Sequence, residues 1–151
     1  MFRLQSILAS LSNLLSINAH TVLVLQAQFK VNEVYDTCST ILKQLGESIP
    51  ESNTLDMASR QIEETINNYE KVGDKWLKGE RTVDKTLNKT LQFYNVIALA
   101  AYFCKSHSML VHFTCKAVQL SLQKGLCCEQ TALALIQFTS AVSNEANAVS
   151  C

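Results

Sequence analysis

Apolar residues recur every three or four positions along most of this chain, which is the spacing of one face of an α-helix. A clear example is residues 33–45, in which the apolar positions are Val34, Cys38, Ile41, Leu42 and Leu45. Gly46 follows at once and Pro50 comes shortly after, as is usual where a helix has ended. The chain contains only one proline and four glycines, and strand-and-turn architectures usually need more breaks than that. The pattern predicts an all-α fold.

Capping residues and glycines divide the chain into about six or seven helices joined by short loops. The predicted helices cover residues 1–17, 19–29, 33–45, 55–72, 85–104, 106–124 and 129–142. We expect residues 1–18 to form a separate amphipathic helix, residues 19–143 to form one helical domain, and residues 144–151 to be a frayed tail. Residues 73–85 are the least regular part of the predicted domain.

Three of the predicted helices have an apolar stripe that indicates which side faces the core. In residues 55–72 the stripe is Leu55, Ala58, Ile62, Ile66 and Tyr69. In residues 85–104 it is Leu87, Leu91, Tyr94, Ala98 and Ala101. In residues 129–142 it is Ala132, Leu135, Ile136 and Thr139. Residues 95–103 are apolar nearly all round, which predicts that the helix containing them is central and buried.

Residues 19–52 also fit the frame of a tetratricopeptide-like repeat. If Pro50 is the closing proline, the aromatic, small, large and small positions of the pattern are taken by Phe29, Cys38, Leu42 and Leu45, and Leu25 matches too. The match is degenerate, because Gln26 occupies the usual glycine position and no second copy aligns as well. We therefore expect antiparallel helix pairs stacked as a tetratricopeptide-like helical repeat.

The charge and the cysteines narrow the class of protein further. Thirteen acidic side chains balance thirteen basic ones, so no basic excess favours nucleic acid or an acidic membrane surface. The most apolar later stretch, residues 96–113, contains Lys105, His107 and His112, which argues against a membrane-spanning helix. Polar residues also interrupt residues 1–17, unlike the apolar centre of a signal peptide. Most of the six cysteines lie within apolar helical patterns, which favours a reducing, cytoplasmic compartment.

Cys104, His107, His112 and Cys115 form the one constellation with the ligand types of a zinc site. Eleven residues of continuous helix rise about 16 Å, so a single helix cannot bring all four to one ion. A chain reversal near Ser106 could bring some of them together. The interpretation that we favour makes both cysteines core residues, with the histidines capping a helix or facing solvent, and no metal or other cofactor is expected.

Other candidate sites are weaker. The chain has no phosphate-binding glycine loop, no zinc-protease motif and no nucleophile elbow. Cys115 with His112 has no nearby Asn or Asp to orient the histidine, and Cys127 with Cys128 is more typical of a turn than of a redox pair. Trp76, among charged residues between two glycines, is either an anchor that holds a loop to the core or an exposed contact for a partner, and we favour the anchor.

Three segments, in this order, resemble the helical-repeat region of very large predicted-ATPase signalling proteins. The segments are ILKQLGESIP at 41–50, YNVIALAAYF at 94–103 and KAVQLSLQKG at 116–125, and AHTVL at 19–23 also fits. The resemblance covers about residues 19–143 and extends to algal and diatom members. In that family the region follows a signal-transduction NTPase module, often after a serine/threonine-kinase-like domain, and some members end in sensor histidine kinase domains.

The resemblance implies a fold and a role, but no catalytic residue. No Walker lysine, kinase catalytic loop or phospho-acceptor histidine box is found in this sequence. We therefore expect a non-enzymatic scaffold segment that acts through contact with protein, either other domains of a parent chain or a signalling partner. We also expect self-association, because a repeat array that is cut at both ends exposes apolar faces. The alternatives are a small metal protein that uses Cys104, His107, His112 and Cys115, or a helical bundle that binds a small ligand.

Overall fold

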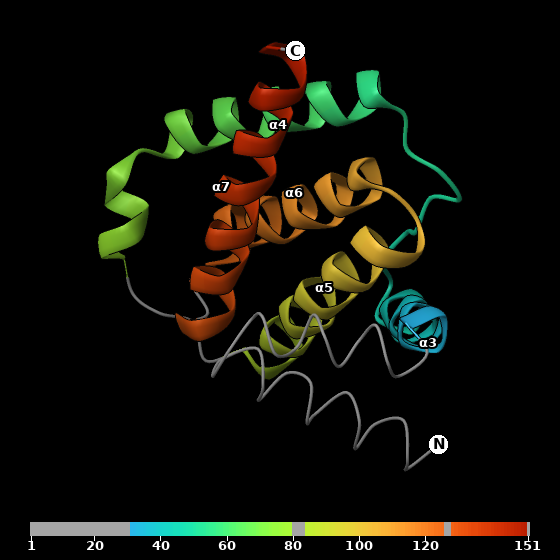
Figure 1. Cartoon of the computed structure of the whole chain (residues 1–151). Helices are drawn as coiled ribbons and strands as arrows, with labels where there is room; N and C mark the ends of the chain where they lie inside the picture. The colour runs from blue at the N-terminus through green and yellow to red at the C-terminus, as the bar shows by residue number, and fades with distance from the viewer. Residues whose placement is uncertain (1–30, 80–83, 126–127, 151) are drawn as a thin grey trace.

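The computed structural model describes residues 31–79, 84–125 and 128–150, and the regular structure in these residues is helical, with no strand among them (Figure 1). The all-α prediction is therefore confirmed for the described part of the chain. The predicted helices at residues 1–17 and 19–29 lie outside the described residues. The repeat marks Leu25, Gln26 and Phe29 lie outside them as well.

Five α-helices and one short 3-10 helix make up the described residues. They are α3 (Val31–Gln44), α4 (Leu55–Val72), η1 (Asp74–Lys78), α5 (Lys85–Cys104), α6 (His107–Lys124) and α7 (Cys128–Ser150). The predicted bounds of α4 and α5 are confirmed. η1 gives regular structure to a segment predicted to be irregular. The predicted end of the last helix at Val142 is wrong, because α7 continues to Ser150 where no glycine or proline interrupts it.

Side-chain caps explain where three of these helices begin. Thr54 Oγ1 accepts a hydrogen bond from the Met57 amide at 3.2 Å, at the start of α4. The Asp84 carboxylate accepts from the first amides of α5, and Ser106 Oγ accepts from the Met109 amide at 3.2 Å at the start of α6. Each cap satisfies amides that have no partner within the helix. The cap at Ser106 places the reversal between α5 and α6 where the sequence predicts it.

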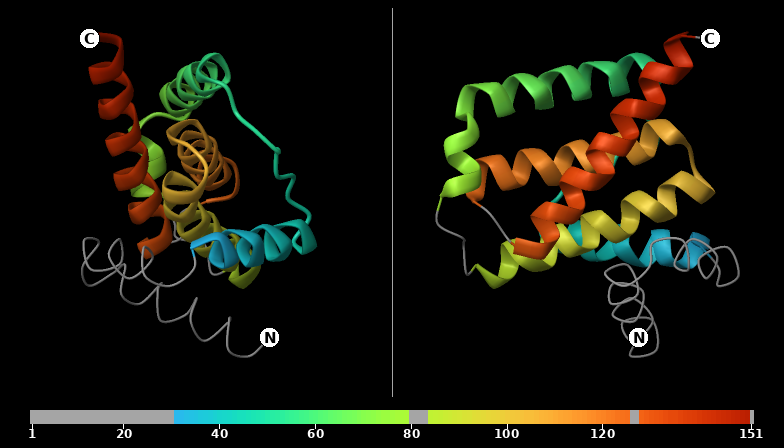
Figure 2. Two further views of the ribbon diagram at one scale, coloured as in Figure 1. Left: turned by 45° about the vertical axis from the view of Figure 1, so that its right-hand side comes forward. Right: turned by 60° about the vertical axis from the view of Figure 1, so that its left-hand side comes forward.

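α5 and α6 form an antiparallel hairpin at the centre of the fold, and the other helices pack around it (Figures 1 and 2). α3 lies against α5, α4 lies against α6, and α7 crosses both α5 and α6. The consecutive helices α3 and α4 therefore pack on different members of the hairpin. The described residues do not confirm the stacked repeat of neighbouring helix pairs.

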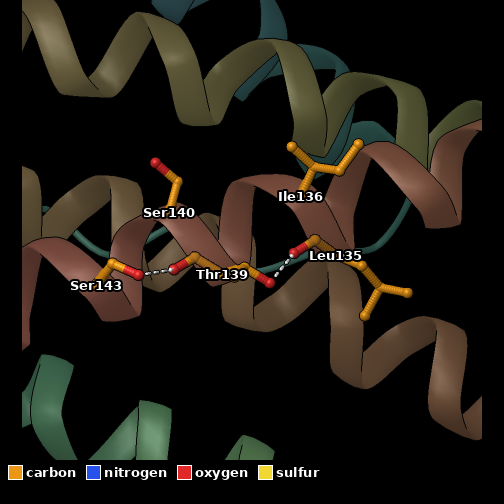
Figure 3. Close-up of a pocket in the computed structure, with 5 residues that line it drawn as sticks. All are labelled: Leu135, Ile136, Thr139, Ser140 and Ser143. Atoms are coloured by element: carbon orange, nitrogen blue, oxygen red, sulfur yellow. Dashed lines mark hydrogen bonds between the residues drawn. The ribbon is translucent and has the colours of Figure 1, made fainter.

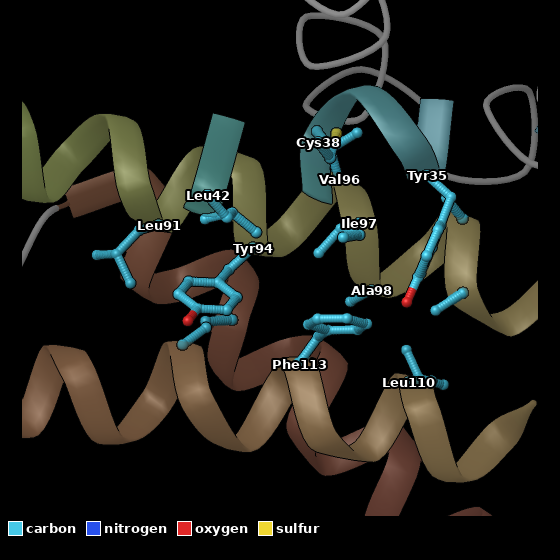
Figure 4. Packing of buried hydrophobic residues seen from close by; sticks show 14 of the residues in the cluster. Tyr35, Cys38, Leu42, Leu91, Tyr94, Val96, Ile97, Ala98, Leu110 and Phe113 are labelled. Atoms are coloured by element: carbon cyan, nitrogen blue, oxygen red, sulfur yellow. The ribbon is translucent and has the colours of Figure 1, made fainter. Parts of the chain in front are cut away.

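The main core lies between α3, α5 and α6 (Figure 4). Leu42, Tyr94 and Phe113 are its largest fully buried side chains, and Tyr94 and Phe113 have ring centroids 6.3 Å apart. All five residues of the predicted α5 stripe are buried, which confirms that face. A second cluster joins α4, α6 and α7 through Ala58, Ile62, Val111, Cys115 and Ala141.

Two of the predicted inner stripes are wrong in part. On α4, Leu55 is 70% exposed and Ile66 is 37% exposed, while Thr65 is fully buried. On α7, Ile136 is 66% exposed, and the buried positions are instead Thr131, Ala134, Gln137 and Ala141.

Polar partners on neighbouring helices account for the buried face of α7. Thr131 Oγ1 lies 3.2 Å from Ser121 Oγ on α6, and Gln137 Nε2 donates to the carbonyl oxygen of Asn95 on α5 at 3.3 Å. The small side chains of Ala134 and Ala141 let α7 pack closely against its neighbours. At the end of α5, Tyr102 and Phe103 are also exposed, so that end is not buried all round as predicted.

Candidate functional site

A groove runs between α4 and α7 over the surface of α6, and we call it the α4–α7 groove. Its volume is about 320 Å³, and its lining residues are Thr65, Ile66, Tyr69, Val118, Leu135, Phe138 and Thr139. None of these lining residues carries a charge. The sequence places Ile66 and Leu135 in predicted core stripes, and the structure instead places them at this partly open surface.

Hydrogen bonds within the fold satisfy the polar groups of the groove. Thr65 Oγ1 donates to the Gln61 carbonyl at 2.7 Å and accepts from Gln119 Nε2 at 2.8 Å. Thr139 Oγ1 donates to the Leu135 carbonyl at 2.8 Å. Because these hydroxyls already have partners, the groove can be covered by an apolar group without leaving them unsatisfied.

Trp76 holds one end of the groove in place. Its indole is only 9% exposed, and its Nε1 donates to the Ser121 carbonyl at 3.0 Å. The Tyr69 ring meets the indole edge to face at a centroid distance of 6.1 Å, and the Tyr69 hydroxyl donates to Asp74 at 3.1 Å. This hydrogen bond raises the pKa of Tyr69 above its ordinary value. The burial of Trp76 agrees with an anchor and leaves little indole surface for the alternative, a partner contact.

A second hollow, of about 410 Å³, lies on the outer side of α7 (Figure 3). It is lined by Leu135, Ile136, Thr139, Ser140 and Ser143. Ser143 Oγ donates to the Thr139 carbonyl at 3.0 Å, in the same way that Thr139 bonds to Leu135. Both hydroxyls therefore turn back onto their own helix, and this surface also has no charged side chain.

His112 is buried at the contact between α4 and α6, where a chain of amides holds it. Asn53 Nδ2 donates to Gln61 Oε1 at 3.0 Å, which leaves Gln61 Nε2 to donate to His112 Nδ1 at 2.9 Å. The imidazole therefore accepts at Nδ1 and carries its proton on Nε2. Burial first, and the Lys116 charge second, lower the pKa of His112 from 6.5 to about 4. His112 is thus a neutral packing and hydrogen-bonding residue near pH 7.

The structure does not bring the predicted Cys/His constellation together as a metal site. Cys115 lies within α6 and is buried in the cluster shared with α4. Cys104 is the last residue of α5, is partly exposed and lies near Tyr35 of α3. His107 lies in the first turn of α6 and is partly buried. In the described part of the chain, no three His, Cys, Asp or Glu side chains gather where they could hold a metal ion.

Two of the described thiols, those of Cys38 and Cys104, are in environments that oppose ionisation. Burial raises the pKa of Cys38 to about 12, and burial is also the main cause of the raised pKa of Cys104. A thiol acts as a nucleophile or a metal ligand mainly as the thiolate, so a raised pKa works against both roles. Cys127 and the side chain of Cys128, which the sequence assigns to a turn in preference to a redox pair, lie outside what the structure describes.

Comparison with known proteins gives this chain no relative: no family model, no curated protein and no solved structure matches it. Within residues 31–79, 84–125 and 128–150, no helix has the length and apolar character needed to cross a membrane. The two uncharged hollows beside α7 are the candidate contact surfaces of the described residues.

Proposed function

We propose that this chain is a non-enzymatic helical scaffold segment that acts by contact with other protein. The observation that carries the proposal is the composition of the α4–α7 groove, which consists of apolar side chains, two hydrogen-bonded threonines and Tyr69, whose hydroxyl donates to Asp74 and whose pKa is raised above its ordinary value. General acid–base or nucleophilic catalysis needs an ionisable or nucleophilic group at the reacting atoms. The groove offers shape and apolar surface, which are the properties of a recognition site.

The groove also suggests the chemistry of its occupant. A charged ligand would lose its hydration there without gaining a partner, because no lining side chain is charged. An apolar side chain has no such favourable hydration to lose, and it is stabilised by burial against Ile66, Val118 and Phe138. The partner that we propose is a polypeptide segment that presents uncharged apolar side chains, either from another protein or from another domain of a parent chain.

The resemblance to predicted-ATPase signalling proteins gives the proposal its wider setting. The segments LGESIP and QLSLQKG, with the apolar stretch between them, are its basis. In that setting the chain is one part of a helical repeat that relays a signal by intramolecular or intermolecular contact in the cytoplasm. The residues that carry the chemistry belong to other domains of such proteins.

Paired variants on α4 test the proposal. Ile66→Glu places a charge in the groove, whereas Leu55→Glu places the same charge at a 70% exposed position of the same helix, outside the groove lining. We expect affinity capture from the source cells to recover a protein with the wild-type chain and with Leu55→Glu, and to lose that protein with Ile66→Glu. Equal recovery by both variants contradicts the proposal, provided that circular dichroism shows both to be folded.

A further inference from the structure

The charges of this chain balance in total but are divided along the sequence. Residues 33–70 contain eight acidic and two basic side chains, whereas residues 71–124 contain nine basic and three acidic side chains. As a result α3, the loop after it and α4 are acidic, and η1, α5 and α6 are basic. Such an asymmetry points to recognition of a charged partner, although the formal net charge of the chain is zero.

Lysines gather at the end of the fold that contains η1, and we call it the η1 end (Figure 1). It comprises η1, the start of α5 and the adjoining ends of α4, α6 and α7. Its exposed lysines are Lys71, Lys75, Lys78, Lys85, Lys89 and Lys124. Its carboxylates are Glu70, Asp74, Asp84 and Glu129. The lysines outnumber the carboxylates, and Asp74 and Asp84 already accept hydrogen bonds within the fold.

The opposite end combines carboxylates with exposed aromatic rings. We call it the hairpin end, because it surrounds the turn between α5 and α6. Lys105 lies 5.0 Å from the centroid of the Tyr35 ring, which places the start of α3 beside this turn. Asn53 Nδ2 donates to the Ser108 carbonyl at 2.7 Å, which holds residues 51–56 there as well. The carboxylates brought together are Glu33, Asp36, Glu51 and Asp56, against the single lysine Lys105.

Two exposed rings belong to the same end. Tyr102 and Phe103 are 48% and 41% exposed, and their ring centroids lie 5.1 Å apart. Aromatic faces attract ammonium groups through the ring quadrupole, and carboxylates attract them through charge. The rings and the carboxylates therefore favour the same kind of partner, a surface that presents lysines.

We propose that the hairpin end of one copy of this chain binds the η1 end of a second copy, head to tail. The η1 end presents the lysines that the hairpin end favours. Within the described residues, no salt bridge occupies Lys85 or Lys89. A second copy therefore supplies the chemistry that complements each end, and the zero formal net charge lets copies approach without long-range repulsion.

The charge distribution selects a head-to-tail contact over a two-fold one. A two-fold contact sets one surface against itself, so it would bring like charges together at either end. The two ends are separated by the length of α5, about 30 Å for its 20 residues, so one molecule cannot join its own ends (Figure 1). Pairing of opposite ends from two copies is the arrangement that satisfies both signs of charge.

The inference does not rest on the proposed function, because the α4–α7 groove and the two ends can be disrupted separately. Ile66 lines the groove in the second half of α4 and belongs to neither end. We expect Ile66→Glu to leave self-association unchanged. Loss of self-association in this variant would overturn the head-to-tail contact and would assign the association to the groove.

Sedimentation velocity in reducing buffer tests whether charge carries the contact. With protein at about 0.5 mM and an ionic strength of about 0.01 M, where charges act over about 30 Å, we expect a weight-average mass above the 16.8 kDa of one chain. At about 1 M salt this range falls to about 3 Å, and the mass should return to 16.8 kDa. A monomer at low salt overturns the proposal. Association that persists at high salt also overturns it, since contacts between apolar surfaces do not weaken in this way.

Double variants with neutral side chains identify the surfaces that meet. Lys85→Gln with Lys89→Gln weakens the η1 end, and Asp36→Asn with Glu51→Gln weakens the hairpin end. Each double variant should raise the Kd of self-association at low salt by about tenfold, the combined effect of two exposed charge contacts. Either double variant that associates as tightly as the wild-type chain overturns the proposal, provided that circular dichroism shows both to be folded.

A matched control and a mixture complete the test. Glu63→Gln with Glu64→Gln removes two charges from the exposed face of α4 between the ends and should leave the Kd unchanged. An equimolar mixture of the two weakened variants should form pairs with about the wild-type Kd, because the intact hairpin end of one meets the intact η1 end of the other. A control that weakens as much as these variants, or a mixture no tighter than either variant alone, overturns the head-to-tail contact.

Discussion

The buried histidine makes a specific prediction about acid stability. His112 is 6% exposed, and Gln61 donates to its Nδ1 through an amide that Asn53 holds in one orientation. Protonation puts a second proton on Nδ1, where it meets the amide hydrogens of Gln61 in a site that burial has removed from water. The contact between α4 and α6 therefore contributes most to the stability of the fold while this imidazole is neutral.

The direction and size of the effect follow from the pKa of His112. The folded pKa of about 4 lies below the ordinary 6.5, so the folded state binds this proton less readily than the unfolded state. The contribution to stability is complete above pH 6.5 and is lost as the pH falls from 6.5 toward 4. A difference of this size corresponds to about 3 kcal/mol at most, and about 2 kcal/mol of it is lost between pH 7 and pH 4.5, because pH 4.5 still lies above the folded pKa.

Urea unfolding at pH 7 and pH 4.5 measures this effect. The comparison variant is His112→Gln, which keeps an acceptor for Gln61 and cannot be protonated in this range. We expect the wild-type chain to lose about 2 kcal/mol more than His112→Gln between the two pH values. Other titrating groups act equally in both proteins and cancel in the difference. Parallel pH dependences in the two proteins would refute the assignment of a buried neutral imidazole.

Two further predictions concern Trp76 and the cysteines. Trp76→Phe keeps the ring contact with Tyr69 and removes the hydrogen bond to the Ser121 carbonyl, which also accepts from the Gly125 amide. We expect the free energy of unfolding, measured in urea, to fall by about 1 kcal/mol. An unchanged unfolding midpoint would contradict the role of Trp76 as an anchor. Metal analysis of the purified protein should find no stoichiometric zinc, because Cys104 and Cys115 lie in different surroundings. Stoichiometric zinc that is lost in the double variant Cys104→Ser with Cys115→Ser would instead support the metal-protein alternative.

Helix positions could be predicted from the sequence because the signals that set them are local. Ser106 and Gly125 bound α6, and Gly73 ends α4, where the sequence places these boundaries. The cap at Ser106 also explains why the reversal between α5 and α6 falls where it does. Each of these signals acts within one or two turns of the helix that it bounds, so no knowledge of the rest of the fold is needed.

The arrangement of the helices could not be predicted in the same way, because it depends on partners far away in the sequence. The buried face of α7 is set by Thr131 and Gln137, whose partners are Ser121 and Asn95 on other helices. A pattern of large apolar residues points instead to Ile136, which the structure leaves 66% exposed. The α4–α7 groove and the hollow on the outer side of α7 both include residues that the apolar pattern assigns to the core. An apolar stripe alone therefore does not distinguish a core face from a contact surface.

The claim that the α4–α7 groove is the contact surface can be tested most directly by hydrogen exchange. The measurement compares the chain alone with the chain bound to the protein that it captures. We predict slower amide exchange on binding in the two segments that line the groove, residues 65–69 of α4 and residues 135–139 of α7. Unchanged exchange in both segments, with new protection confined to α3, would contradict the account.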